Sequence, residues 1–295
     1  MVTGIITAVI TGALIGCVYS LIALGIVLIY KTTQVFNLAQ GEMLLIGTWL
    51  TWTMITVANL PFWLSLIIAL LFSILLGMLI ERFILRPMLG QPLLPIIMIT
   101  IGIFSLLRGI SIYFWGGEVQ SFPPLFPIEV ITIGFIPVST HLLAAAIMAT
   151  LLVIVTYAYF RFTRGGLAMM ATAENVMIAQ SLGTNVKAAF SRSWAISAMV
   201  GTLSGVLLGS IMGIFFGLSD LSFKAFPVII LGGLESIPGV LVAGPIMGIC
   251  ESLGATFLDP MVGGGIGDIV PYVVMLIVLV IRPSGLFGYK IIERV

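Results

Sequence analysis

Long apolar stretches without a single charged side chain constrain this chain more than any other feature. Asp, Glu, Lys and Arg are absent from residues 1–30, 43–80, 87–107, 142–160 and 193–219. A helix needs about 20 apolar residues to cross the hydrocarbon core of a bilayer, and these stretches do not alternate as barrel strands do. Since a bilayer accepts only helices or closed barrels, the sequence predicts an all-α polytopic membrane protein.

The composition excludes two other classes of protein. Only 8% of the 295 residues are charged, against roughly 25% in a soluble domain. Twelve Lys and Arg against eleven Asp and Glu leave a net charge of +1, so there is no basic surface for nucleic acid. The two cysteines, Cys17 and Cys250, do not form a disulfide framework.

The predicted spans lie within these stretches. We expect helices near 7–30, 43–57, 61–80, 93–115, 139–160 and 194–216, with a turn at Asn59-Leu60-Pro61. A further span is expected at 267–281. Residues 225–257 form a hairpin broken by Gly and Pro at 232–239, which lines a pathway or is an ordinary kinked pair of packed helices. The total is about eight transmembrane helices in one domain, 1–295.

Basic residues in short loops predict the orientation, because they concentrate on the cytoplasmic side. The predicted internal segments carry Arg82 and Arg86, then Arg161, Arg164, Lys187 and Arg192, and finally Arg282, Lys290 and Arg294. The loop 116–140 carries only acidic charge and is expected outside. The N-terminus is therefore expected outside and the C-terminus inside. The first 30 residues lack the positive n-region of a signal peptide, so we expect the first helix to be retained.

The usual catalytic motifs are missing from the sequence. There is no Gly-Lys-Ser/Thr phosphate loop, no Gly-x-Ser-x-Gly elbow and no metal-ligand spacing, and His141 is the only histidine. We therefore expect no catalytic residue, no metal and no cofactor bound by this chain.

Ionisable residues in or beside the spans are functional candidates, because a charge in hydrocarbon is costly. Glu42 follows Asn37 and Gln40, and its carboxylate could equally stabilise the N-terminus of a helix. Arg108 lies deep in a span and requires a partner, and a structural ion pair is one explanation for it. Glu235 and Glu251 could pair with such cations or line the path.

Two charges near the predicted outer surface have a simpler interpretation. Asp220 and Lys224 follow the sixth predicted span, and both are expected to be solvated.

The internal loop 161–193 contains a predicted helix over 167–182, with Gly183 as its C-cap. This helix is too polar to cross the bilayer and too apolar on one face for water. Docking on a cytoplasmic protein is favoured over binding to the membrane surface, because the basic residues of the loop do not follow one face of the helix.

Several motifs in this chain resemble those of a known family. They are Tyr19-Ser20-Leu21-Ile22-Ala23-Leu24-Gly25, Asn37-Leu38-Ala39-Gln40-Gly41-Glu42, Thr100-Ile101-Gly102, Ala173-Glu174-Asn175 with Leu182-Gly183, Phe223-Lys224-Ala225-Phe226, Leu231 to Gly239, and Arg282 to Gly288. Together they resemble the branched-chain amino acid permeases of the LivH type, which are subunits of ATP-binding-cassette importers. The motifs span nearly the full length of the chain in the expected order.

The resemblance implies a permease in a bacterial inner membrane that works by alternating access. Its implied partners are a second related permease or a second copy, two ATPase subunits that hold ATP and Mg, an extracytoplasmic solute-binding protein and the bilayer. It implies ATPase coupling through Ala173, Glu174, Asn175 and Gly183. The translocation path is expected along Asn37, Gln40, Glu42, Arg108, Gly232, Gly233, Glu235 and Pro238.

Two differences from the family pattern leave the identity of the solute open. Gln40 stands where the family commonly has His, and Arg108 where an uncharged polar residue is more usual. Relatives carry branched-chain amino acids, other amino acids, urea, short amides or small aromatic acids. A stand-alone channel or secondary transporter and a membrane-embedded enzyme are the alternatives of other classes.

Overall fold

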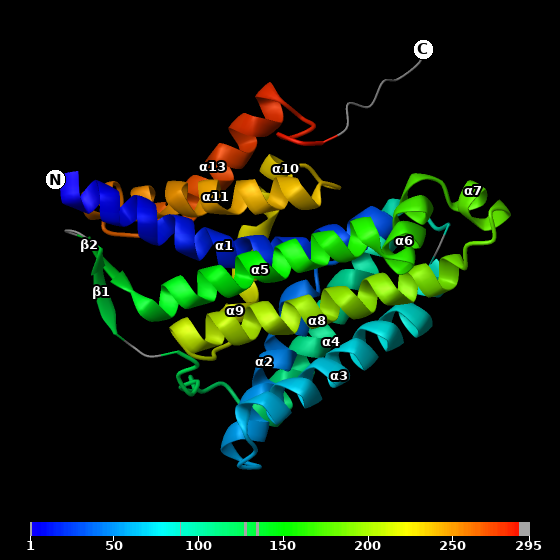
Figure 1. The fold of residues 1–295 in the computed structure, drawn as a ribbon, viewed down its shortest axis with the longest axis horizontal. Helices are drawn as coiled ribbons and strands as arrows, with labels where there is room; N and C mark the ends of the chain where they lie inside the picture. Colours follow the sequence, from blue (N-terminus) through cyan, green and yellow to red (C-terminus); the bar gives the residue numbers. More distant parts are fainter. Residues whose placement is uncertain (1, 89, 127–128, 134–135, 289–295) are drawn as a thin grey trace. The chain divides into compact units, whose positions relative to one another are not determined.

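The computed structural model describes residues 2–88, 90–126, 129–133 and 136–288. Its longer helices are α1 (Val2–Thr33), α2 (Gln40–Thr56), α3 (Phe62–Ile80), α4 (Leu93–Trp115), α5 (Thr140–Phe162), α8 (Val186–Met212), α11 (Ile237–Phe257) and α13 (Ile266–Ile281). The shorter elements are η1 (Glu81–Leu85), η2 (Arg86–Met88), α6 (Arg164–Glu174), α7 (Val176–Ser181), α9 (Gly217–Asp220), η3 (Leu221–Lys224), α10 (Ala225–Gly232), α12 (Asp259–Val262), β1 (Val130–Ile133) and β2 (Ile136–Ser139). Figure 1 shows these elements along the chain.

The described helices confirm a polytopic membrane protein. Six of them are long and apolar enough to span a bilayer: α1, α3 with its η1 and η2 extension, α4, α5, α8 and α11. The helix α2 has 17 residues and α13 has 16, so they are about 25 Å long against a hydrocarbon core of about 30 Å. The predicted total of about eight and the predicted orientation remain predictions, and Lys290 and Arg294 lie outside the described residues.

The loop 116–140 contains a two-stranded sheet, which departs from the predicted all-α fold. Strands β1 and β2 pair antiparallel, with Val130 opposite Ser139. All four β1 residues are β-branched, as are Ile136 and Val138 of β2, and such side chains favour extended backbone.

The internal loop is shorter than predicted. Helix α8 begins at Val186, whereas the prediction placed its start at 194, because only the charge-free stretch was counted as a span. Residues before that stretch are amphipathic: Val186, Ala189 and Phe190 are buried, and Lys187 is exposed. The side chain of Asn185 caps the helix by accepting from the N–H of Ala188.

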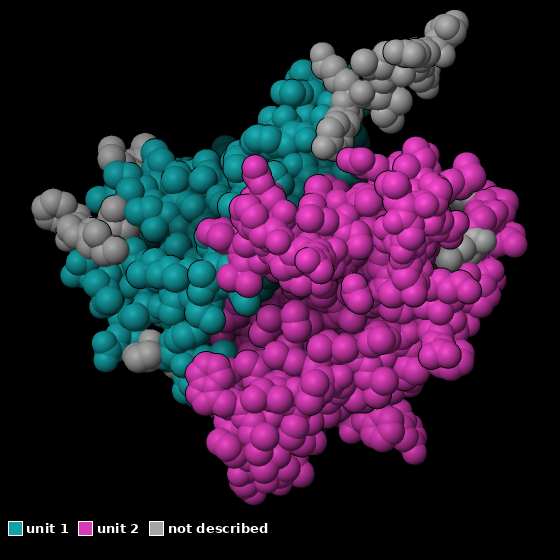
Figure 2. All heavy atoms as spheres, turned by 45° about the vertical axis from the view of Figure 1, so that its right-hand side comes forward, with its two compact units in different colours: residues 1–24, 124–153, 224–295 teal, residues 25–123, 154–223 magenta. Residues whose placement is uncertain are grey.

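The contacts divide the chain into two compact units, which Figure 2 colours separately. Unit 1 comprises residues 1–24, 124–153 and 224–295, and unit 2 comprises 25–123 and 154–223. Helices α1 and α5 each contribute one part to each unit.

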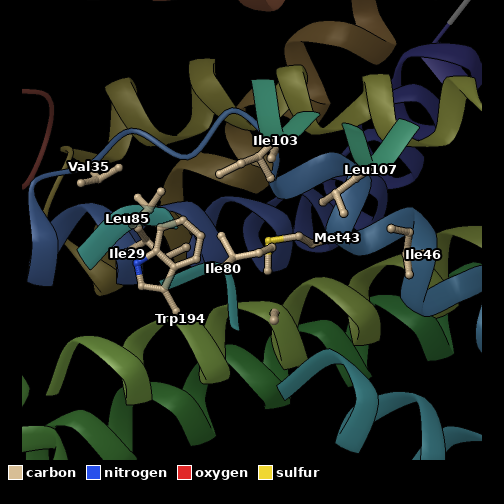
Figure 3. Packing of buried hydrophobic residues seen from close by; sticks show 11 residues of the cluster. Ile29, Val35, Met43, Ile46, Ile80, Leu85, Ile103, Leu107 and Trp194 are labelled. Atoms are coloured by element: carbon tan, nitrogen blue, oxygen red, sulfur yellow. The ribbon is translucent and has the colours of Figure 1, made fainter. Parts of the chain in front are cut away.

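In unit 2, α8 packs against α2 and α3, and α4 packs against α2. The buried core seen in Figure 3 includes the indole of Trp194, which is fully buried. Its members come from α1, α2, α3, α4 and α8, together with the π-helical turn η1 and the segment after α1. This core places α2 and α4, which carry Glu42 and Arg108, in the same unit.

In unit 1, the first half of α1 packs against α11 through glycines. A Cβ at Gly12 would meet the carbonyl of Gly248, and a Cβ at Gly16 would meet the carbonyl of Gly244. Each helix therefore carries a pair of glycines four residues apart, and the missing side chains let the backbones approach closely.

Candidate functional site

A charged cluster in unit 2 joins two of the predicted path residues. The Arg108 Nε donates to Oε1 of Glu42 at 2.7 Å, although 66 positions separate them in the chain. The side chain of Glu42 has no exposed surface, whereas that of Arg108 is 24% exposed. Glu42 is thus the partner carboxylate that the sequence required for Arg108. Its position in the first turn of α2 also lets it interact favourably with the helix dipole.

Two residues that the sequence analysis did not select complete this cluster. The Arg108 Nη2 donates to Ser219 Oγ at 2.5 Å and to Asp220 Oδ1 at 2.8 Å. The guanidinium also lies over the ring of Phe104, with its carbon 5.2 Å from the ring centroid. Asp220 is the first charge after the stretch 193–219, and that placement was the signal available to find it. Its carboxylate is 54% exposed, so it is partly solvated as expected but also paired.

The second oxygen of Glu42 has no partner among the described residues. Glu42 Oε2 is buried and makes no hydrogen bond. A buried carboxylate oxygen without a donor is unfavourable unless another group supplies one. The cluster therefore retains one buried acceptor without a donor among the described residues.

The other two predicted residues of this segment form a separate buried network. Asn37 Nδ2 donates to Gln40 Oε1 at 3.2 Å, and Gln40 Nε2 donates to the carbonyl of Ser197 at 3.1 Å. The Ser197 hydroxyl lies 2.6 Å from the carbonyl of Gly25 and 3.0 Å from Gln40 Oε1. Both amide side chains are almost completely buried. This network fastens α2 to α8 and to the second half of α1.

A second charged cluster lies in unit 1 and corrects the expectation for Lys224. Its Nζ donates to Glu251 Oε1 at 2.6 Å and to Asp268 Oδ1 at 2.7 Å. Only 14% of the Lys224 side chain is exposed, so the predicted solvation of this residue is wrong. Tyr19 also donates to Glu251 Oε1, at 3.2 Å. The reason is that α11 and α13 bring two carboxylates to the end of η3, which is a tertiary effect.

The broken hairpin has its interruption inside the predicted range, between α10 and α11. Gly233 has φ +103°, and the Ser236 side chain caps α11 by accepting from the N–H of Gly239. Gly232 and Gly239 are in backbone contact, since a Cβ on either would meet the other residue. The eight residues of α10 extend about 12 Å, less than half of the hydrocarbon core.

The C-terminal motif packs onto this interruption. The N–H of Leu286 donates to the carbonyl of Leu231 at 2.7 Å, and that of Phe287 donates to the carbonyl of Gly232 at 3.2 Å. A Cβ at Gly233 would lie 2.6 Å from the nitrogen of Gly288. Both Gly232 and Gly233 are buried by these contacts, whereas Glu235 is partly exposed and Pro238 is exposed.

The predicted coupling helix is two helices, and this corrects the expected single helix over 167–182. Asn175 is extended, with φ −159° and ψ 112°, and its side chain caps α7 by accepting from the N–H of Ile178. Asparagine competes for backbone donors in this way and so favours helix ends over helix interiors. The predicted stop at Gly183 is confirmed: its φ is +83°, and its N–H donates to the carbonyl of Gln180. With Thr184 donating to Ala179, this is a Schellman motif.

The exposed side of these two short helices is apolar. Gly166, Met169 and Thr172 of α6 are buried, and α6 packs on α8. The opposite surface exposes Leu167, Val176, Met177, Ile178 and Leu182, beside the exposed carboxylate of Glu174. We call these six residues the α6–α7 surface. Several large exposed apolar side chains outside the spans are typical of a protein interface.

The comparison with known families decides the identity of the fold. The model described as "Branched-chain amino acid transport system / permease component" matches residues 5–279. The chain belongs to this family. The match covers both charged clusters, the broken hairpin and the α6–α7 surface, and it supports a multi-pass protein of the bacterial inner membrane.

Named relatives are similar over nearly the whole chain. The "High-affinity branched-chain amino acid transport system permease protein LivH" of Salmonella typhimurium is 28% identical, over 96% of each chain. BraD of Pseudomonas aeruginosa, named in the same way, is 28% identical over 97% of this chain and 96% of its own. The "Probable branched-chain amino acid transport permease protein LivH" of Methanocaldococcus jannaschii is 29% identical, over 91% and 88%.

Proposed function

We propose that this chain is the permease subunit of an ATP-binding-cassette importer for branched-chain or related small amino acids. The family match over residues 5–279 carries the proposal. The chain itself forms the path and hydrolyses no nucleotide. Two ATPase subunits, an extracytoplasmic solute-binding protein and a second permease, related or identical, complete the importer.

The α6–α7 surface is the proposed docking site for an ATPase subunit. Glu174 ends α6, Asn175 starts α7, and both are exposed next to Met177 and Ile178. The Schellman motif at Gly183 holds the end of α7, and α8 follows after Thr184 and Asn185. Because the connection is short, a displacement of the α6–α7 surface is transmitted to α8. Closure of the two ATPase subunits on ATP would displace this surface and so change which side of the membrane the path opens to.

The Arg108–Glu42 cluster and the broken hairpin are the proposed path elements. Arg108 retains 24% exposure although it lies inside a span, and a charged side chain at such depth usually faces a wet interior. The short helix α10 supports a role of the broken hairpin in the path, because interrupted helices are tolerated where they line a cavity. The buried amides of Asn37 and Gln40 would support the path from behind rather than touch solute.

A self-sufficient secondary transporter is less well supported. Such proteins couple transport to ions through membrane carboxylates. Here Glu42 and Glu251 are each bonded to a basic side chain of their own unit, which leaves no free carboxylate pair for ion coupling in either cluster.

Reconstitution tests the proposal directly. The chain is incorporated into proteoliposomes alone, then with the ATPase subunits, binding protein and second permease of the proposed importer, and uptake of labelled leucine is compared with that of urea. We expect leucine uptake only with ATP and all partners. Uptake by the chain alone, without nucleotide, would refute the importer; ATP-driven uptake of urea but not leucine would refute the amino acid assignment.

A matched pair of variants tests the coupling surface. Glu174→Lys reverses a charge on the α6–α7 surface, and Glu118→Lys reverses one in the loop 116–140, outside it. In the full importer we expect Glu174→Lys to keep the ATP hydrolysis rate of the parent chain but to lower leucine uptake at least tenfold. Glu118→Lys changes a residue outside the α6–α7 surface and should keep ATPase docking. Equal uptake per ATP in Glu174→Lys and the parent chain would remove the coupling assignment.

A further inference from the structure

A mostly apolar cavity in unit 2 is not used by the proposed transport cycle. Its volume is about 310 Å³, and its walls are formed by Ile74 of α3, Val155, Thr156 and Tyr159 of α5, and Ala195, Ile196 and Met199 of α8. We call it the α3–α5–α8 slot. These three helices are candidate membrane spans, so the slot lies at the depth of the bilayer.

Basic side chains gather at one end of this slot. On α8, Arg192 precedes Ile196 by about one helical turn and Met199 by about two, so all three residues lie on one face of the helix. Along the helix axis, Met199 lies about 10 Å from Arg192. On α5, Tyr159 is followed by Arg161 and, at the start of α6, by Arg164. All three arginines are exposed. The slot is therefore apolar along its length, and exposed arginines flank its lining residues in the sequence at one end of α5 and α8, which we call its mouth.

The backbone around Gly165 shapes this mouth. A Cβ built at Gly165 would lie 2.7 Å from the Tyr159 hydroxyl and 3.6 Å from Nη1 of Arg192. The hydroxyl of a residue that lines the slot and the guanidinium at its end therefore border the same point. Because glycine has no side chain there, the Tyr159 hydroxyl can lie against the backbone of Gly165, beside the Arg192 guanidinium.

The positive charge at the mouth is uncompensated within the described part of the chain. Among the described residues, the basic side chains in ion pairs are Arg86, Arg108 and Lys224. None of these ion pairs involves Arg161, Arg164 or Arg192. Arg161 donates only to the Tyr157 hydroxyl, a neutral acceptor. Exposed cations without an acidic partner beside the end of a membrane span attract an anionic group.

We infer that the α3–α5–α8 slot binds an anionic phospholipid, with one acyl chain between α5 and α8 and the phosphate on Arg192, Arg164 and the Tyr159 hydroxyl. The apolar walls match an acyl chain, and the donors at the mouth match a phosphate of the adjacent leaflet. A zwitterionic lipid has the same chain but a compensated headgroup, so it binds more weakly. The site is independent of the transported solute, since it shares no residue with either charged cluster.

Photolabelling tests this site in the full chain. The protein is reconstituted in phosphatidylcholine nanodiscs containing either phosphatidylglycerol or phosphatidylcholine with a diazirine on the acyl chain. Labelled peptides are mapped by mass spectrometry after illumination. We expect the phosphatidylglycerol probe to label the peptides with Val155, Ile196 and Met199 at least fivefold more than the phosphatidylcholine probe.

Two variants separate the headgroup from the acyl chain. Removing both charges in Arg164→Gln/Arg192→Gln should lower phosphatidylglycerol labelling by about thirtyfold, as expected for about 1 kcal/mol per basic residue near an anionic surface. Ile196→Trp fills the slot and should lower labelling by both probes. Arg282→Gln, an exposed arginine of unit 1, is the matched control and should leave labelling unchanged.

Several results would overturn the proposal. Equal labelling by the two probes, or labelling of the slot no stronger than that of exposed Leu71 and Leu151, would mean that bulk lipid merely wets this surface. Unchanged labelling in the double arginine variant would remove the headgroup site even if Ile196→Trp failed to fold. Disulfide cross-linking between two copies of Met199→Cys would show that a second permease fills the slot.

Discussion

The pair formed by Arg108 and Glu42 allows a quantitative test of its structural role. Glu42 has no exposed side-chain surface and receives the Arg108 Nε at 2.7 Å, while its other oxygen already lacks a donor. Arg108→Met keeps the apolar stem and removes the charge. The variant leaves a buried carboxylate without its cation, and breaking a buried pair in this way costs about 3–5 kcal/mol.

The other contacts of Arg108 contribute less to this figure. Asp220 is 54% exposed, so solvent screens its interaction, and Asp220→Asn should cost less than about 1 kcal/mol. Glu42→Gln removes one charge-assisted bond but leaves Arg108 with Asp220 and some solvent, so about 1.5–3 kcal/mol is expected. Glu42→Gln combined with Arg108→Met removes both charges together, and the loss should fall well below that of Arg108→Met alone.

The assay measures the free energy of unfolding of the purified chain in one fixed detergent. Tryptophan fluorescence monitors unfolding of the parent and of the four variants. A loss below about 1 kcal/mol in Arg108→Met, or a double variant at least as unstable as Arg108→Met, would refute the interpretation as a coupled buried pair. Leucine uptake by the same variants in the full importer then separates the two roles. A double variant that recovers stability but not uptake places the pair in the path, and recovery of both makes it a structural pair only.

Three further predictions concern other parts of the chain. Gly16→Leu would drive a side chain into the backbone of α11 and should destabilise the protein by more than about 1 kcal/mol, whereas Gly4→Ala, with nothing within 4 Å, should be neutral in the same unfolding assay. Lys224→Met should cost about 1.5–3 kcal/mol by removing the cation between two carboxylates, and adding Glu251→Gln should recover part of it; no recovery would contradict the paired arrangement. Gly183→Val forces a β-branched residue to φ +83° and should cost about 1–3 kcal/mol locally, measured as faster proteolysis of the 164–185 segment at unchanged global stability.

Local features of the fold were predictable because they depend on neighbouring residues. The turn before α3 was predicted from Pro61, which stands at its N-cap with φ −62°. The stop at Gly183 was predicted from the residue type that tolerates positive φ. The errors at the start of α8 and at Asn175 are also local. A count of charge-free residues does not detect the amphipathic first turns of α8, and a segment without Gly or Pro can still be interrupted where an asparagine caps a new helix.

The partners of the charged residues were not predictable in the same way. The depth of Arg108 in its span required some carboxylate, but Glu42, Glu235 and Glu251 were equally available in the sequence. Lys224 was wrongly expected to be solvated, because the residues that bury it lie 27 and 44 positions away, in other helices. The same holds for the contact between Gly233 and Gly288, two motif residues whose proximity no local pattern indicates.

The sequence by itself determined that this chain crosses a membrane and where most of its helices lie, because hydrocarbon selects apolar stretches of a set length and requires each to satisfy its own backbone hydrogen bonds. Only the tertiary structure decided which carboxylate neutralises which cation and which arginines remain unpaired beside the slot. These choices depend on the side-chain distances created when helices far apart in sequence pack together, and electrostatic energies change steeply over a few ångströms.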